Sequence, residues 1–164
     1  MENENKEKTL DFDDEIIRTF VGENTDYYIE KWQTSKDPAK NPSWNWSSFL
    51  VGWLWLGYRK MHSTFLWFFG VLVAIDIIDI FFGLHFICLV ARIALMVIMG
   101  VFGNALYYNH MKKTVTNIQN NYKNVEEQKL EIEKDGGTSW FSLAILWIVM
   151  ILYSILWEAL MAYK

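Results

Sequence analysis

Two long stretches that are almost free of charge constrain this chain more than any other feature. They cover residues 63–108 and 139–163, and their charged or imidazole side chains are Asp76, Asp79, His85, Arg92 and Glu158. A helix of roughly 20 apolar residues crosses a hydrocarbon core of about 30 Å. With a hydrophobic share of 52%, the sequence predicts an all-α, multi-pass membrane protein.

The first stretch is long enough for two helices. Its apolar runs are separated by Gly83, Leu84 and His85, a connection short enough to impose an antiparallel hairpin. No Gly or Pro lies between residues 108 and 135, so we expect the second helix to continue beyond the membrane as one rod. A third membrane helix is expected over residues 140–162.

A tryptophan-rich segment precedes the hairpin. From Trp44 to Tyr58, with Ser43 as the expected cap, a helix is roughly 23 Å long, shorter than the hydrocarbon core. Trp and Tyr are enriched where lipid meets water. We interpret the segment as an interfacial or re-entrant helix at the cytoplasmic leaflet, and a short fourth span is the alternative. The side chains of this membrane-interface anchor are Trp44, Trp46, Trp53, Trp55, Tyr58, Arg59 and Lys60.

Basic residues predict the orientation. Arg59 and Lys60 precede the hairpin, and Lys112 and Lys113 follow it; cytoplasmic loops are enriched in such residues. The acidic first twenty residues contain no apolar signal segment, so we expect a cytosolic N-terminus. Three spans then place the C-terminus outside, whereas a spanning tryptophan-rich segment would invert the later helices.

The remaining segments are expected in the cytosol. Residues 1–10 are predicted to be disordered, and short amphipathic helices are predicted from about 11 to 20 and from about 25 to 35. An apolar stripe at helical spacing follows the hairpin: Val115, Ile118, Tyr122, Val125 and Ile132. The N-terminal helices are the nearest cover for this stripe, and self-association or a partner protein is the alternative.

These expectations divide the chain into five segments. They are the cytosolic N-terminal segment 1–42, the tryptophan-rich helix 43–60, the transmembrane hairpin 61–109, the cytosolic amphipathic helix 110–138 and the last transmembrane helix 139–164.

A cluster of charges is expected inside the membrane. Asp76 and Asp79 share one helix face, and an ionised side chain in lipid costs about 3 kcal/mol. Counted from the hairpin turn, Arg92 lies at a depth in the membrane similar to that of the two aspartates. Glu158, near the end of the last span, is expected toward the same outer side of the membrane. One interpretation is structural, with Arg92 neutralising an aspartate and fixing helix register. The other is a proton or cation relay of surplus carboxylates, which would need an oligomer.

Three blocks of sequence resemble a known family. They are "FVGENTDYYIEKW", "WNWSSFLVGWLWLGYRKM" and "GNALYYNHMKK", and together they resemble the bacterial membrane proteins grouped as domain of unknown function 2628. The resemblance covers roughly residues 20–113. It implies a small integral protein of the bacterial cytoplasmic membrane with a cytosolic N-terminal segment, and it implies no activity. Some relatives carry a metal-binding ribbon, for which this chain, with Cys88 as its one cysteine, lacks the ligands.

No motif indicates catalysis. The three histidines lack paired metal-ligand spacing, and neither a nucleophile elbow nor a Gly-rich phosphate loop occurs. We therefore expect no enzyme, metal or cofactor, and the net charge of −4 gives no reason to expect nucleic acid. The expected function is a scaffold or adaptor in the lipid bilayer that binds a second copy or a partner protein through its cytosolic helices. An oligomeric channel or proton-coupled transporter is the alternative.

Overall fold

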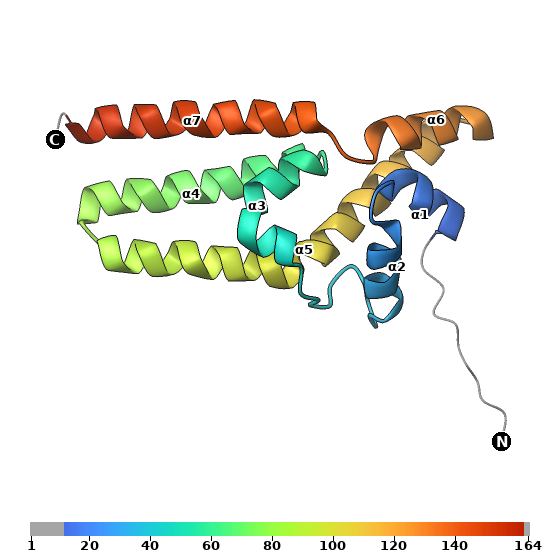
Figure 1. Ribbon diagram of the computed structural model, residues 1–164, viewed down its shortest axis with the longest axis horizontal. Coiled ribbons are helices and arrows are strands. Elements are labelled where there is room, and N and C mark those ends of the chain that lie inside the picture. Colours follow the sequence, from blue (N-terminus) through green and yellow to red (C-terminus); the bar gives the residue numbers. More distant parts are fainter. Residues whose placement is uncertain (1–11, 163–164) are drawn as a thin grey trace, which may run out of the picture. The chain divides into compact units, whose positions relative to one another are not determined.

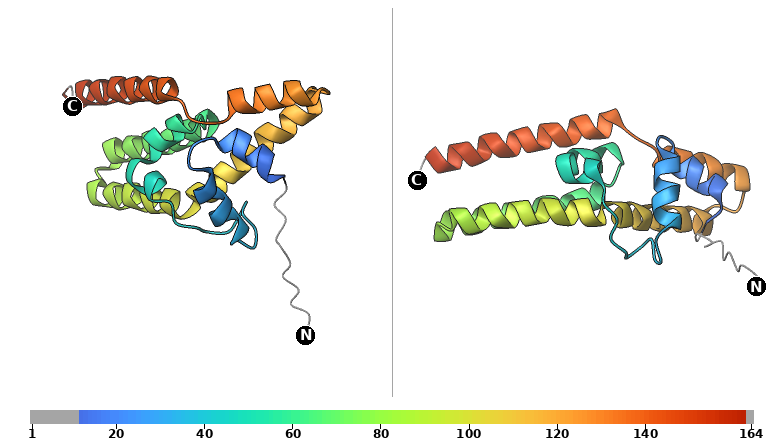
Figure 2. Two further views of the ribbon diagram at one scale, coloured as in Figure 1. Left: turned by 45° about the vertical axis from the view of Figure 1, so that its right-hand side comes forward. Right: turned by 60° about the horizontal axis from the view of Figure 1, so that its bottom comes forward.

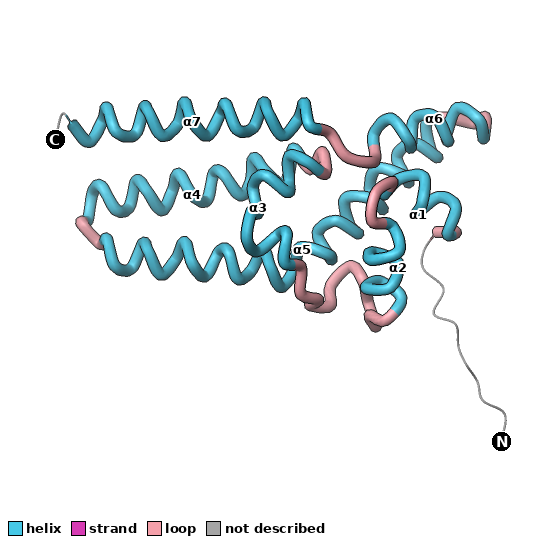
Figure 3. Tube along the Cα trace, in the orientation of Figure 1, coloured by secondary structure: helices cyan, strands magenta, loops and turns pink. Residues whose placement is uncertain are grey.

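The computed structural model describes residues 12–162, whose regular secondary structure is entirely helical (Figures 1 and 3). The expectation for residues 1–10 lies outside this range. The helices of the described chain are α1 (Asp14–Val21), α2 (Thr25–Gln33), α3 (Trp46–Tyr58), α4 (His62–Phe82), α5 (His85–Asn121), α6 (Val125–Asp135) and α7 (Trp140–Ala162). They form two compact units, and α5 contributes to both.

The N-terminal unit combines the described part of Met1–Trp44 with Val101–Gly137. Helices are present in both places where short ones were predicted, as α1 and α2. Each buries one apolar face in this unit: Ile17, Phe20 and Val21 from α1, and Tyr28, Ile29 and Trp32 from α2. The two helices are too short to be stable alone, so their stability comes from this packing.

An aromatic cluster joins α2 to α5. The ring of Trp32 lies 5.2 Å from that of Tyr108 and 5.9 Å from that of Tyr107, between ring centroids. The ring of Tyr28 lies 4.8 Å from that of Tyr107. The Trp32 indole N–H donates to the Asn104 carbonyl oxygen at 3.1 Å, so its one polar atom is satisfied although the residue is buried. The N-terminal helices thus cover the part of α5 that follows residue 100.

The expected single rod from the hairpin to residue 135 is wrong. Helix α5 does continue to Asn121, but the chain then turns at residues 122–124 and α6 runs back (Figure 2). The Asn124 side chain accepts a hydrogen bond from the Glu126 N–H at 3.0 Å. This cap satisfies an N–H group at the start of α6, so the helix is broken without Gly or Pro.

The turn also divides the predicted apolar stripe. Val115, Ile118 and Ile132 are buried, whereas Tyr122 and Val125 are exposed, Val125 by 73%. The last two side chains lie at the turn, where helical spacing no longer places them on the buried face. They do not belong to the packing surface.

Helix α6 is held against α1. The Gly137 N–H donates to the Phe20 carbonyl oxygen at 2.6 Å, and a side chain at Gly136 would collide with the same oxygen. The Lys129 ammonium lies 3.0 Å from a Glu15 carboxylate oxygen. The hydrogen bond to Glu15 raises the pKa of Lys129, so the Lys129 ammonium stays charged at neutral pH.

The apolar unit consists of Asn45–Gly100 and Thr138–Lys164, described to residue 162. Three segments of the described chain are long and apolar enough to cross a membrane: α4, α5 and the range Val125–Ala162, whose apolar part is α7. In their most apolar windows only 11%, 28% and 6% of residues are buried. Most apolar side chains therefore face outward, which is compatible with a membrane protein.

The hairpin of α4 and α5 turns at Gly83, whose φ of +65° is the left-handed conformation that glycine adopts without strain. Helix α7 spans the predicted residues. At its start the Ser139 hydroxyl accepts a hydrogen bond from the Ser142 N–H at 3.1 Å. Here the sequence pattern and the structure agree.

The tryptophan-rich helix α3 begins later than expected. Its cap is Asn45 rather than Ser43, because the Asn45 side-chain oxygen accepts the Ser48 N–H at 2.9 Å. Its backbone leaves helical geometry at Val51, with φ of −131° and ψ of 35°. The helix is therefore bent and shorter than the stretch from which it was predicted.

Both ends of α3 lie at one end of the hairpin. At its start, the Asn45 N–H donates to the Gly100 carbonyl oxygen at 2.8 Å. At its end, the Ser139 N–H, one residue before α7, donates to the Tyr58 carbonyl oxygen at 2.8 Å, and α4 begins at His62. Helix α3 thus returns to the end at which it began.

Close packing of α3 on α7 depends on Gly57. A Cβ atom at Gly57 would lie 2.8 Å from Leu146 Cδ1 and 3.3 Å from Leu143 Cα, whereas one at Gly70 of α4 would meet nothing within 4 Å. We expect Gly57→Ala to lower the free energy of unfolding by about 1–3 kcal/mol. Gly70→Ala should leave it unchanged or raise it slightly, because alanine is the better helix former and meets no neighbour there. Thermal unfolding in detergent measures both, and equal melting temperatures would refute the close contact.

Candidate functional site in the apolar helices

The hairpin brings two acidic side chains of α4 against one cation of α5. Asp76 and Asp79 lie one turn apart, and both face Arg92. The Arg92 Nη2 atom is 2.5 Å from Asp76 Oδ1 and 3.7 Å from Asp79 Oδ2. Both aspartate side chains are 13% exposed and Arg92 is 34% exposed. Three of the four residues singled out from the sequence therefore meet.

Two further residues complete this charge cluster, which comprises Asp76, Asp79, His85, Arg92 and Tyr153. The Tyr153 hydroxyl of α7 donates to Asp76 Oδ2, and His85 Nδ1 lies 2.8 Å from Asp79 Oδ1. Sequence reasoning missed both partners. The signal was a hydroxyl inside an apolar span, because such a group needs a hydrogen-bond partner when it is removed from water.

Glu158 does not join the cluster. Its side chain is exposed, and no hydrogen bond or ion pair of the described residues connects it to the other acids. The reason is helical rotation. Tyr153 and Trp157 are four residues apart and share a face of α7, whereas each further residue turns by about 100°. Glu158 therefore points away from the side that meets Asp76.

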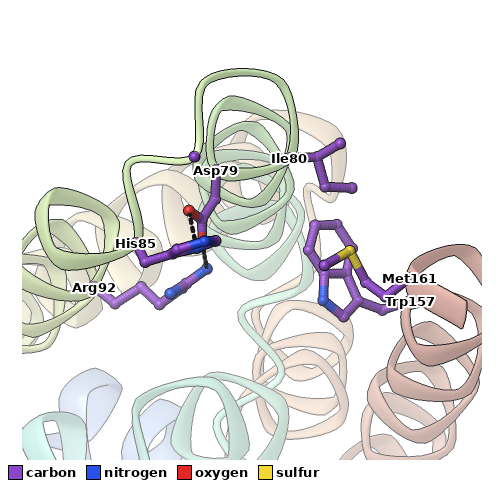
Figure 4. A pocket seen from close by; sticks show the side chains of 7 residues that line it. Asp79, Ile80, His85, Arg92, Trp157 and Met161 are labelled. Atoms are coloured by element: carbon purple, nitrogen blue, oxygen red, sulfur yellow. Dashed lines mark ion pairs between the residues drawn. The ribbon is translucent and has the colours of Figure 1, made fainter. Parts of the chain in front are cut away.

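A cavity of about 290 Å³ adjoins the cluster near the hairpin turn. It is lined by Asp79, Ile80, Gly83, His85, Arg92, Trp157 and Met161. Figure 4 shows Asp79, His85 and Arg92 gathered on one side, with Ile80 beside Trp157 and Met161 on the other. The cavity thus has one ionic wall and one aromatic and apolar wall.

The two aspartates differ in how closely their carboxylate oxygens are paired. Asp76 uses one oxygen for Arg92 and the other for Tyr153. Asp79 lies farther from Arg92, and its closer partner is His85, whose side chain is 77% exposed. The two aspartates therefore share one guanidinium group, that of Arg92. Asp79 is therefore the group most available to another cation.

No metal centre is formed by the described residues, where no group of three His, Cys, Asp or Glu side chains could hold an ion. Cys88 is a buried free thiol whose Sγ lies 3.6 Å from the Ile75 carbonyl oxygen. This contact links the two hairpin helices and agrees with a packing role.

The predicted interface anchor divides into outward and inward residues. Trp46 is 65% exposed, whereas Trp55 and Arg59 are only 4% and 3% exposed. Trp44, Trp53, Tyr58 and Lys60 are partly buried. Arg59 is thus enclosed by the protein rather than exposed at its surface, and the position of the anchor at a membrane interface stays a prediction.

Comparison with known proteins identifies one family. The family described as protein of unknown function (DUF2628) matches residues 4–113, a range that includes Asp76, Asp79, His85 and Arg92. No curated protein and no solved structure matches the chain. Since the matched range covers well over half of the 164 residues, the protein belongs to the DUF2628 family.

Proposed function

We propose that the protein is a non-enzymatic scaffold of the bacterial cytoplasmic membrane. In this proposal α4, the first part of α5, and α7 cross the bilayer, and the N-terminal unit lies in the cytosol. The exposed apolar surface of these helices supports the crossing. Lys112 and Lys113, which are both exposed on the N-terminal unit, support the cytosolic side.

Helix α3 is proposed to be re-entrant or interfacial rather than a fourth span. The support is the position of its two ends, which hydrogen-bond to Gly100 and Ser139 at one end of the hairpin. The bend at Val51 and the exposed Trp46 agree with this placement, because amphipathic aromatic side chains favour the headgroup layer.

The observation that carries the scaffold proposal is the pairing of Asp76. Both of its oxygens are used within the apolar unit, by Arg92 and Tyr153. A relay of carboxylates requires groups that exchange protons or ions with water, whereas these contacts tie α4 to α5 and α7. They favour a structural lock over an ion pathway.

A partner is proposed to bind the N-terminal unit at α6. This helix exposes Val125 by 73% and Leu130 by 65%, between acidic and basic side chains. Neither residue contributes to the buried core of the unit, so a partner can contact both without unfolding it.

Site-specific photo-crosslinking in cells tests the scaffold. With a benzophenone side chain at Leu130 or Val125 we expect a discrete protein adduct, whereas Ile148 of α7, exposed by 56%, is the lipid-facing control. Two results together would refute the proposal in favour of a channel. They are the absence of a protein adduct at both α6 positions, and proton flux in reconstituted vesicles that Asp79→Asn abolishes.

A further inference from the structure

The cavity beside the charge cluster has the chemistry of a headgroup site. A carboxylate facing an indole is suited to an ammonium group, because the first supplies charge and the second a cation–π surface. In Figure 4 Asp79 and Trp157 stand on the two sides of the cavity. The closer of the two partners of Asp79 is the exposed His85, whose side chain would have to turn aside for an ammonium group to bind.

A phosphate has donors on the same ionic wall. Arg92 contacts both aspartates through Nη2. The guanidinium also has N–H donors on Nη1 and Nε, which can donate to a phosphate. Guanidinium groups bind phosphate well, and His85 adds a second donor when it turns toward the cavity. Ammonium and phosphate groups can therefore be held a few ångströms apart.

The remaining lining suits an acyl chain. Ile80 and Met161 are apolar and border the cavity, and Met161 is 41% exposed. Asp79 lies four residues before Gly83, roughly 6 Å from the helix end. If α4 spans the bilayer, this depth is where headgroups meet hydrocarbon.

We propose that this cavity binds a zwitterionic phospholipid headgroup, with its ammonium between Asp79 and Trp157 and its phosphate on Arg92 and His85. The inference rests on the proposed membrane location but not on the scaffold role. Asp79, the proposed partner of the ammonium group, disfavours an anionic lipid that lacks one, such as phosphatidylglycerol.

Native mass spectrometry of the full chain in detergent tests this site. The probe is an equal mixture of phosphatidylethanolamine and phosphatidylglycerol with identical acyl chains. We expect about tenfold preferential retention of phosphatidylethanolamine, and we expect Trp157→Leu or Asp79→Asn to remove the preference. Trp147→Leu is the matched control, because Trp147 is exposed on α7 outside the cavity, and it should keep the preference.

A competition experiment distinguishes recognition of the lipid headgroup from binding of the acyl chains. Displacement of the bound lipid by soluble glycerophosphoethanolamine supports headgroup recognition, whereas displacement by diacylglycerol alone overturns it. Equal retention of the two lipids by the wild type, or equal losses in Trp157→Leu and Trp147→Leu, also overturns it. Alkaline extraction of the same membranes shows separately whether the protein is inserted. An inserted protein without lipid preference would refute the headgroup site alone.

Discussion

We expect Arg92→Leu to lower the free energy of unfolding by about 2–3 kcal/mol. The change removes the cation that faces Asp76 and Asp79 and leaves two largely buried carboxylates without it. Breaking a buried pair in this way costs about 3–5 kcal/mol, and we expect less here because Arg92 is 34% exposed. Thermal unfolding in lipid nanodiscs measures the loss.

Removal of the whole charged set should restore stability. Asp76→Leu with Asp79→Leu leaves Arg92 unpaired and is also destabilising. The triple variant removes every unpaired charge of this set and should recover most of the stability. The remaining loss is that of the Tyr153 hydroxyl, which no longer has Asp76 as its acceptor. Glu158→Leu is the matched control, since that side chain is exposed and outside the cluster. A triple variant as unstable as Arg92→Leu would contradict the structural lock, as would three variants as stable as the wild type.

Trp32→Ala is expected to unfold much of the N-terminal unit. Trp32 is 1% exposed, packs on Tyr107 and Tyr108, and satisfies the Asn104 carbonyl oxygen. Loss of a buried tryptophan costs about 3–5 kcal/mol. Hydrogen exchange of the intact chain should show faster exchange in α2 and in residues 101–121 of α5.

The control for Trp32→Ala is Leu130→Ala. Leu130 is 65% exposed in the same unit, so its truncation should change stability by less than about 0.5 kcal/mol. If the backbone amides of α2 are equally protected from hydrogen exchange in both variants, the aromatic cluster does not hold the unit together.

The positions of the apolar helices could be predicted because hydropathy and turn residues are local signals. The limits of α7 and the turn at Gly83 followed directly from them. The meeting of Asp76 with Arg92 was also predictable, because a short turn fixes the relative depth of two antiparallel helices.

Other features depend on information that hydropathy does not carry. The apolar side chains of α7 are spread around the whole helix, so hydropathy did not indicate which side faces α4. The sequence therefore did not show that Tyr153 faces Asp76 and that Glu158 lies on another side. The break before α6 depends on the cap at Asn124, and asparagine is also tolerated within helices. Burial of Arg59 depends on how α3 packs on other helices.

The family match also bears on the cavity. It ends at residue 113, so the ionic wall formed by Asp79, His85 and Arg92 lies within the matched range. Trp157 and Met161, the wall on the other side, belong to α7 beyond it. The proposed headgroup site therefore combines the family segment with the C-terminal helix.

The sidedness of single cysteines tests the membrane arrangement most directly. In a Cys88→Ser background, Pro42→Cys, His62→Cys and Leu84→Cys place thiols before α3, at the start of α4 and at the hairpin turn, all at exposed positions. With a membrane-impermeant maleimide on right-side-out vesicles, we expect labelling at position 84 and protection at 42 and 62 until the membrane is opened. Opposite labelling at positions 42 and 62 would show that α3 crosses the bilayer and would contradict the proposed arrangement.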